Sequence, residues 1–232
     1  SGVSSNNQIP IPLLVQANYF FRWSMAISHN LTNSINLNYN ATNDNIINVN
    51  NLLGTDLSRA ELNLFDNFLN IGEANYFNQS LTLNYSLPFS TIPYLDFIQS
   101  SYTYSGDFNW QTGSDILNNI IDSNGVVLGN ISTIQNSNNQ SVVASLNFDK
   151  FYRNFKFLNK KNNFYDVLKS LKRVRINYTE NSGKVIPGYV PSIGFFGTTK
   201  PSLGFIFGNQ SNVRYELAKM GYLTNFSGFN EQ

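Results

Sequence analysis

The sequence contains no cysteine and only one histidine, and both shortages narrow the chemistry that the chain can support. Without cysteine there is no disulfide framework, no thiolate zinc site and no cysteine nucleophile. The histidine, His29, lies beside a predicted tight turn, and we interpret it as a solvated turn residue. The carboxylates are scattered, with no pair at a spacing suited to acid–base catalysis or metal binding. We therefore expect no catalytic residue, no metal site and no cofactor, and predict that the protein is not an enzyme.

Charge is also scarce. Lys, Arg, Asp and Glu make up 12% of the residues, whereas a typical soluble domain has roughly 25%. The net charge of +1 gives no electrostatic reason to expect a nucleic-acid partner. No apolar run reaches the length of about 18 residues that indicates a membrane-spanning helix. The start, Ser1-Gly2-Val3, has no initiator Met and no signal peptide, so we expect the chain to be a piece of a longer one.

Aromatic residues and neutral polar residues are abundant. Phe, Tyr and Trp account for 15% of the chain, and Asn for about one residue in six. Amides and hydroxyls, rather than charges, therefore carry the polarity. This composition suits a wall with lipid on one side and water on the other, because aromatic rings and neutral polar groups can occupy opposite faces of one strand.

Strict alternation of apolar and polar residues is the dominant pattern. Three runs have apolar residues on one face: Phe77, Leu81, Leu83, Tyr85 and Leu87; Ile98, Tyr102, Tyr104, Phe108 and Trp110; and Ile35, Leu37, Tyr39 and Ala41. Weaker runs cover residues 19–27, 142–148 and 174–178. A period of two predicts β-strands. We predict about six strands, several of them near the ~9–11 residues that cross a bilayer at a tilt.

The connections between these strands alternate in length. Short ones are expected at 29–33 and 88–97, long ones at 43–75 and 111–133, an intermediate one at 149–168, and a last one from about residue 180. Short turns on one rim and long loops on the other are typical of an outer-membrane barrel. The predicted fold is therefore all-β, a segment of an antiparallel transmembrane β-barrel, with residues 1–232 forming part of one large barrel and each strand pairing with its sequence neighbour.

The long loops are expected to contain some helix. Candidates are 56–69, capped by Asp56, a weaker one at 114–121, and 211–220, ended by Gly221. Residues 181–232 are interpreted as a loop rich in Gly, Pro and aromatics with one short helix. Because residues 187–224 also carry many large apolar side chains, exposing them would be unfavourable. We expect this loop to be ordered and packed against the rim or facing the lumen.

Several motifs follow one another in a fixed order in the C-terminal third. They are Arg175-Ile176-Asn177-Tyr178-Thr179-Glu180, Ile186-Pro187-Gly188-Tyr189-Val190-Pro191, Leu203-Gly204-Phe205-Ile206-Phe207-Gly208-Asn209-Gln210, Val213-Arg214 and Gly221-Tyr222-Leu223-Thr224. Shorter matches lie upstream at 37–43, 78–81, 92–97, 104–110 and 134–139. In this order the chain resembles the SprA family, also called Sov, the giant outer-membrane translocons of the type IX secretion system in Gram-negative Bacteroidota. The family proteins are many times longer, and residues 156–165 lack a longer Lys-rich insertion.

The resemblance implies a protein-conducting channel at the cell surface that exports folded cargo and, in gliding species, serves motility. The implied partners are outer-membrane lipid, secreted cargo, and the plug and accessory proteins of the translocon, with no nucleic acid. The motif residues that the resemblance marks as structural are Pro187, Gly188, Tyr189, Pro191, Gly204, Phe207, Gly208, Gln210, Arg214 and Gly221. From the residues alone, a nutrient-uptake outer-membrane barrel and a soluble extracellular glycan-binding β-sandwich stay open as alternatives.

Overall fold

The computed structural model describes residues 18–48, 71–114, 121, 125, 129, 131–155 and 170–225. The helix expected at 56–69, most of the one expected at 114–121, and the stretch 156–165 lie outside these residues. The chain has two compact units, one made of Ser1–Phe21 with Asn45–Glu73 and the other of Arg22–Asp44 with Ala74–Gln232. The site described below lies within the second unit.

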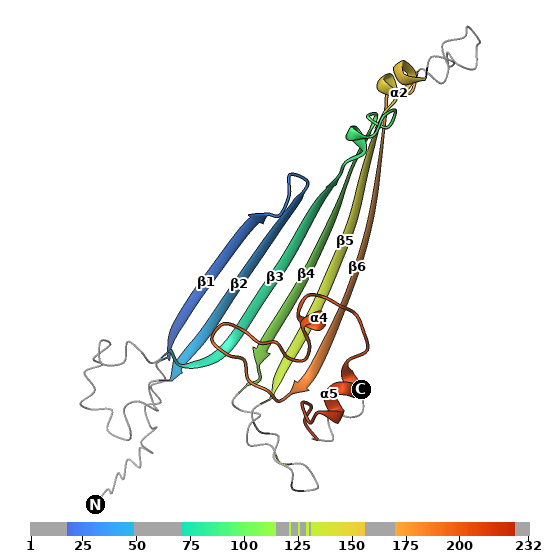
Figure 1. The fold of residues 1–232 in the computed structure, drawn as a ribbon. Helices are drawn as coiled ribbons and strands as arrows, with labels where there is room; N and C mark the ends of the chain where they lie inside the picture. Colours follow the sequence, from blue (N-terminus) through green and yellow to red (C-terminus); the bar gives the residue numbers. More distant parts are fainter. Residues whose placement is uncertain are drawn as a thin grey trace, which may run out of the picture. The chain divides into compact units, whose positions relative to one another are not determined.

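Six strands form one sheet whose spatial order is the order of the sequence (Figure 1). They are β1 (Asn18–Asn30), β2 (Ile35–Asn48), β3 (Glu73–Leu87), β4 (Ile98–Thr112), β5 (Ser132–Asn147) and β6 (Arg173–Tyr189). The pairs β3–β4, β4–β5 and β5–β6 are antiparallel. The predicted all-β class and the pairing of neighbours are confirmed. No helix within the described residues has the length and apolar character needed to cross a membrane.

The register separates the sheet into two chemically different faces. Leu83 lies opposite Tyr104, and Tyr104 lies opposite Gln140. Directly opposed residues of antiparallel strands point to the same side, so the apolar runs of β3 and β4 share one face, named the aromatic face here. The other face, the polar face, carries Asn, Ser and Thr that pair across strands; Thr103 Oγ1, for example, donates to Asn84 Oδ1 at 3.0 Å.

The first four connections alternate in length as predicted, but the fifth, residues 148–172 at the turn end, is longer than the intermediate 149–168 that was expected. The turn end of the sheet holds the hairpin at 31–34, where Leu31 N donates to Ile35 O at 2.9 Å, and the connection 88–97 with its short helix η2 (Phe89–Thr91). At the loop end, β2, β4 and β6 end and β3 and β5 begin. Helix α2 (Phe148–Asn154), at the turn end, was not predicted; Asn147 caps it by accepting a hydrogen bond from Lys150 N.

Strand β6 is longer than expected and contains Pro187 and Gly188, which we had placed in the loop 181–232. Its register shifts by one residue beside β5, because Ile134 pairs with Ile186 while Ser132 pairs with Tyr189. Gly188 has φ +74°, a conformation that favours glycine. Proline is tolerated at such a bulge, where no ladder hydrogen bond from its nitrogen is needed. The bulge lets the strand continue past a residue that normally ends one.

Residues 190–224, named the C-terminal cover, pack on the aromatic face at the loop end of the sheet (Figure 1). The cover contains α4 (Leu203–Ile206) and α5 (Arg214–Lys219). Helix α5 is shorter than the predicted 211–220, although Gly221 follows it with φ +69°, as expected of the residue after a helix. Leu217 of α5 is fully buried, whereas Met220, just after the helix, is 46% exposed.

Candidate functional site

The aromatic face is best described as rows of opposed residues across β4, β5 and β6. From the loop end these rows are Trp110–Ile134–Ile186, Phe108–Asn136–Lys184, Gly106–Asn138–Ser182, Tyr104–Gln140–Glu180 and Tyr102–Val142–Tyr178. The first three rows lie beneath the cover, where Phe108 and Ile134 are completely buried. The last row is bare, with Tyr178 59% exposed, so the face changes from covered to open within two rows.

Buried amides on the covered rows hold the cover by its backbone carbonyls. Asn136 Nδ2 donates to Phe205 O and to Asn209 O, both at 2.9 Å. Asn138 Nδ2 donates to Gly208 O at 2.8 Å. A buried carbonyl without a partner would be costly, and these side chains remove that cost. The amides are therefore docking groups for an irregular segment rather than misplaced polar residues.

Two further donors extend this contact along β3 and β4. Gln79 Nε2 donates to Ile206 O at 3.2 Å, and Tyr104 Oη donates to Phe207 O at 2.5 Å. Gln79 and Gly106 are interruptions in the apolar alternation of their strands. Sequence reasoning passed over these gaps, yet they mark where the cover is seated.

Glycines bring the cover into backbone contact with the sheet. A Cβ placed on Gly106 would lie 2.1 Å from Phe207 O, and one placed on Gly208 would lie 3.0 Å from Gly106 Cα and 2.7 Å from Ser137 O. Gly208 also has φ +91°. Any side chain at either position would separate the two backbones, so both residues are required by the close approach. The motif residue Gly208 thus has a structural reason.

The cover reaches β1 and β2 through an aromatic corner. Trp23 contacts Phe195, with ring centroids 5.5 Å apart, and also Phe77, at 6.4 Å. Asn43 Nδ2 donates to Phe195 O at 3.1 Å. On β4, Trp110 Nε1 donates to Pro191 O at 3.3 Å. The cover is therefore anchored across the sheet from β1 to β6.

The structure divides the motif residues into two groups. Gly208 O accepts from Asn138 Nδ2, and Gln210 Nε2 donates to Asn136 Oδ1 at 3.2 Å. The neighbouring Phe207 O accepts from Tyr104 Oη. Gly204 supports the same turn, because Asn209 N donates to Gly204 O at 2.8 Å.

The second group lies where the chain returns to β6. Tyr189, which is 1% exposed, forms an isolated antiparallel β-bridge with Leu223. Next to it, Thr224 N donates to Gly188 O at 2.8 Å. Pro187 and Arg214 stand beside this return, and Gly221 ends α5 just before it. Pro191 lies apart from both groups, where its carbonyl accepts from Trp110 Nε1. The motif residues therefore fasten the cover at several places and do not form one site.

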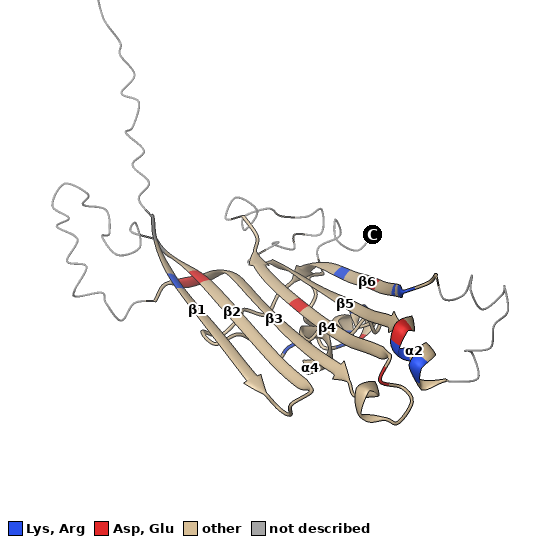
Figure 2. Cartoon of the chain, turned by 90° about the horizontal axis from the view of Figure 1, so that it is seen from above, with Lys and Arg blue, Asp and Glu red and all other residues tan. Residues whose placement is uncertain are grey.

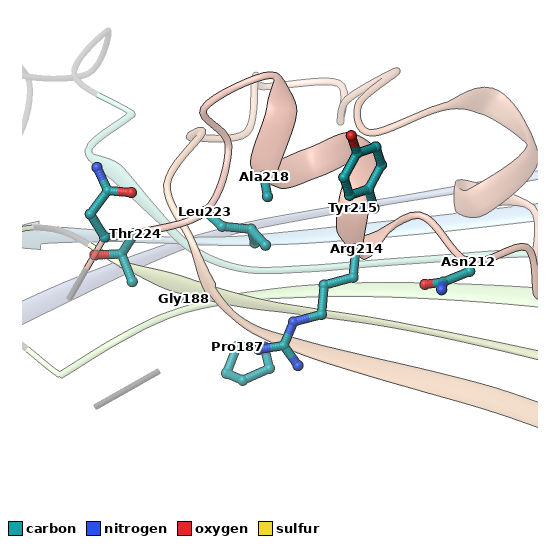
Figure 3. Close-up of a pocket in the computed structure, with 9 residues that line it drawn as sticks. Pro187, Gly188, Asn212, Arg214, Tyr215, Ala218, Leu223 and Thr224 are labelled. Carbon is teal, nitrogen blue, oxygen red and sulfur yellow. The ribbon is translucent and has the colours of Figure 1, made fainter. Parts of the chain in front are cut away.

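Within the part of the chain that the structure describes, two cavities adjoin the cover. The first, of about 420 Å³, is lined by Pro187, Gly188, Asn212, Arg214, Tyr215, Ala218, Leu223, Thr224 and Asn225. Figure 3 shows the Arg214 side chain reaching from α5 towards Pro187. The second, of about 460 Å³, is lined by Tyr104, Asn138, Gln140, Glu180, Ser182, Asn209 and Gln210. We name this second one the rim cavity, because the last residues of the covered rows meet the edge of the cover there.

Charges contribute little to either face. Figure 2 shows Lys, Arg, Asp and Glu at isolated positions on the strands. Arg22 and Asp44 form an ion pair on the polar face, with Nε and Oδ1 2.5 Å apart. Among the residues that the structure describes, no three His, Cys, Asp or Glu side chains gather as metal ligands would. A comparison with protein-family models and a comparison with curated proteins both give no match.

Proposed function

We propose that this chain is part of the wall of an outer-membrane β-barrel that exports proteins, a translocon of the SprA type in the type IX secretion system. The observation that supports it best is the separation of faces in a single antiparallel sheet, aromatic and apolar on one side, hydroxyl and amide on the other. A barrel wall needs this arrangement because its strands touch lipid and water at once. The ordered motifs of the sequence supply the link to protein export.

The uncovered part of the aromatic face, from the row of Tyr102, Val142 and Tyr178 towards the turn end, is named the bare band here, and it fits contact with lipid. Ile176 is 55% exposed and Tyr178 is 59% exposed, and the row of Tyr102, Val142 and Tyr178 carries no charge. Tyr104 still donates to Phe207 O at the edge of the cover, which leaves six of the 15 residues of β4, 98–103, bare. A tilted crossing of ~9–11 residues would therefore also include the rows at the edge of the cover.

Aromatic rings gather at the turn end of the same sheet. Phe97 packs on Phe151 with ring centroids 4.9 Å apart, and Phe151 packs on Phe155 at 4.7 Å. Tyr94 joins this group through Phe155 at 6.3 Å. Membrane barrels carry such rings at the boundary between hydrocarbon and water. The cluster supports a membrane boundary at the turn end.

The polar face suits the lumen. Its side chains are mostly neutral and satisfy one another, as in Thr82 Oγ1 and Ser105 Oγ at 3.0 Å or Ser141 Oγ and Thr179 Oγ1 at 3.3 Å. A lining with few charges has little tendency to hold a passing polypeptide of either sign. Under this proposal the cover lies on the lipid side of the wall, at the rim, because it shares a face with the bare band. This proposal corresponds to the rim-packed one of the two placements expected for this segment.

Cysteine cross-linking in the full-length protein tests the proposal, and the described sequence offers no background thiol. Adjacent positions on β3 report the two faces: Asn84→Cys on the polar face and Leu83→Cys on the aromatic face. During export, cargo stalled in transit should cross-link to the cysteine at 84, while the cysteine at 83 should react with a membrane-partitioned maleimide. The reverse pattern would contradict the assignment of faces. Cargo cross-links at neither position, in cells that assemble the protein normally, would contradict export along this wall.

A further inference from the structure

We propose that the rim cavity binds the uncharged, hydroxyl-rich headgroup of a membrane lipid, a glycolipid in chemical class, whose acyl chain lies along the bare band of the sheet. The proposal rests on the proposed function in one respect: the bare band must face the bilayer. Everything else about it comes from the position of the cavity and from the polar atoms that line it.

The position of the cavity calls for an amphipathic ligand. Its floor is the row Tyr104–Gln140–Glu180 together with Asn138 and Ser182, and its wall on one side is Asn209 and Gln210 of the cover. On the other side is the bare row of Tyr102, Val142 and Tyr178, about 7 Å away along the strands. A molecule that fills the cavity and continues along the face would therefore contact polar side chains at one end and apolar side chains at the other.

The polar atoms of the cavity are only partly used by the protein. Gln140 Oε1 accepts from Tyr102 Oη at 3.2 Å, and Glu180 Oε2 accepts from Tyr178 Oη at 3.2 Å. Among the described residues, no partner is found for Gln140 Nε2, Glu180 Oε1 or Ser182 Oγ. The same holds for Asn209 Nδ2 and Gln210 Oε1.

These free atoms are a mixture of donors and acceptors. The two amide nitrogens donate, the carboxylate and amide oxygens accept, and the serine hydroxyl does both. A ligand hydroxyl also donates and accepts, so several neighbouring hydroxyls match such a set better than a group that only accepts. This mixture is the chemical reason for assigning a sugar-like headgroup.

The charges of the cavity argue against an anionic headgroup. Glu180 lines it with a carboxylate. Lys184, one row beyond Ser182, is turned to the cover: its Nζ donates to Gln210 O at 2.6 Å and to Ser211 O at 2.8 Å. A phosphate placed here would face a like charge without a dedicated cation, which is unfavourable at short range.

The part of the ligand that lies along the bare band should be a hydrocarbon chain, because that surface is apolar. Leu83 and Tyr85 of β3 continue the row of Tyr102 and Tyr104, and Ile176 lies beyond Tyr178 on β6. None of these side chains is charged, which complements an acyl chain and offers a soluble protein partner no ion pair. The occupant is therefore a lipid, and a second copy of the chain becomes an alternative outcome of the test.

The test uses the full chain in lauryldimethylamine oxide, a detergent with a zwitterionic head, and titrates dodecyl maltoside as the probe. Native mass spectrometry counts the retained molecules. We expect one dodecyl maltoside to be retained against the excess of the first detergent. Gln140→Ala and Glu180→Ala should each weaken retention about tenfold, as the loss of one or two hydrogen bonds predicts. The controls Asn139→Ala and Asn181→Ala, the next residues on the polar face, should leave retention unchanged.

Other outcomes separate the sources of the ligand. Free maltose competing as well as dodecyl maltoside would overturn the lipid assignment, since the acyl chain would contribute nothing. Equal retention of phosphatidylethanolamine would overturn the headgroup assignment, and dimers in place of adducts would overturn the choice of occupant.

A second measurement keeps this proposal apart from the proposed function. Ile176→Trp places a fluorophore on the bare band, and brominated lipids quench its emission only if the band faces the bilayer. Quenching without a dodecyl maltoside adduct overturns the headgroup site alone. Absence of quenching overturns the membrane placement, on which both proposals depend.

Discussion

Replacing Gly106 by Ala tests the seating of the cover on the sheet. The added Cβ would lie 2.1 Å from Phe207 O and 2.6 Å from Phe207 C. Both contacts are with backbone, so no side-chain rotation relieves them. Either the cover moves away from β4 or the strand is displaced beneath it. Elsewhere in a strand, Gly→Ala would be mildly stabilising, and the expected sign is therefore specific to this contact.

The size of the effect follows from the bonds nearest to Gly106. Moving Phe207 and Gly208 outwards breaks the hydrogen bond from Tyr104 Oη and the one from Asn138 Nδ2 to Gly208 O. At about 1 kcal/mol each, with about 1–3 kcal/mol of overpacking, the cover should lose roughly 3–5 kcal/mol of docking free energy. Because about 1.4 kcal/mol is a factor of ten in an equilibrium constant, local opening should rise by about two to three and a half orders of magnitude.

Hydrogen exchange measures this opening directly. The amides of Gly208 and Asn209 donate within the cover, to Phe205 O at 3.1 Å and Gly204 O at 2.8 Å, and their exchange should accelerate while amides at the turn end of the sheet stay protected. Gly183→Ala is the matched control, because its Cβ comes no closer than 3.1 Å to a neighbour, Asn136 O. Unchanged protection of Gly208 in the Gly106→Ala protein would refute the seating. Acceleration throughout the sheet would show that the contact stabilises the whole fold rather than the cover.

Two further predictions concern the faces and a buried hydroxyl. Leu83→Arg should impair assembly in outer membranes by about 2–4 kcal/mol if the aromatic face meets lipid, and Asn84→Arg should cost far less; equal assembly of both variants would contradict the face assignment. Tyr189 Oη is buried and has no hydrogen-bond partner among the described residues, so Tyr189→Phe should leave the free energy of unfolding unchanged or raise it by up to about 1 kcal/mol. Tyr104→Phe should lower it by about 1 kcal/mol, because that hydroxyl donates to Phe207 O. A larger loss in Tyr189→Phe than in Tyr104→Phe would mean that the unpartnered hydroxyl is in fact bonded.

The strands and their faces were predictable because their pattern is local. Leu81, Leu83 and Tyr85 differ from their neighbours at every second position, and the register confirms that they share a face with Tyr102 and Tyr104. The lengths of the strands were less predictable. Strand β6 was expected to end near Glu180, since Pro187 and Gly188 normally end a strand, and only the pairing with β5 reveals the bulge that accommodates them.

The site itself was predictable only in part. The apolar content of the C-terminal cover correctly predicted that it packs, since Phe205 and Leu217 are fully buried. The place where it packs depends on contacts between residues far apart in the sequence, such as Asn136 with Phe205, and no local period encodes them. A usable signal existed nonetheless: an amide or glycine at an apolar position of an otherwise regular strand, as at Gln79 and Gly106.

If the sheet crosses a bilayer as proposed, these interruptions also account for one face lying against both protein and lipid. A strand of 15 residues is longer than such a crossing requires, so part of its apolar side would be covered by protein or left in water. Gln79 and Asn138 suit a protein cover because their amides donate hydrogen bonds to its carbonyls, and Gly106 suits it because the missing side chain leaves room for its backbone. Beyond them, Leu83 and Tyr102 suit hydrocarbon and offer an irregular segment few donors. The change of residue type along one face therefore sets where the cover ends, and moving an amide to Leu83 by Leu83→Gln should not extend the cover unless a carbonyl of the chain can reach it.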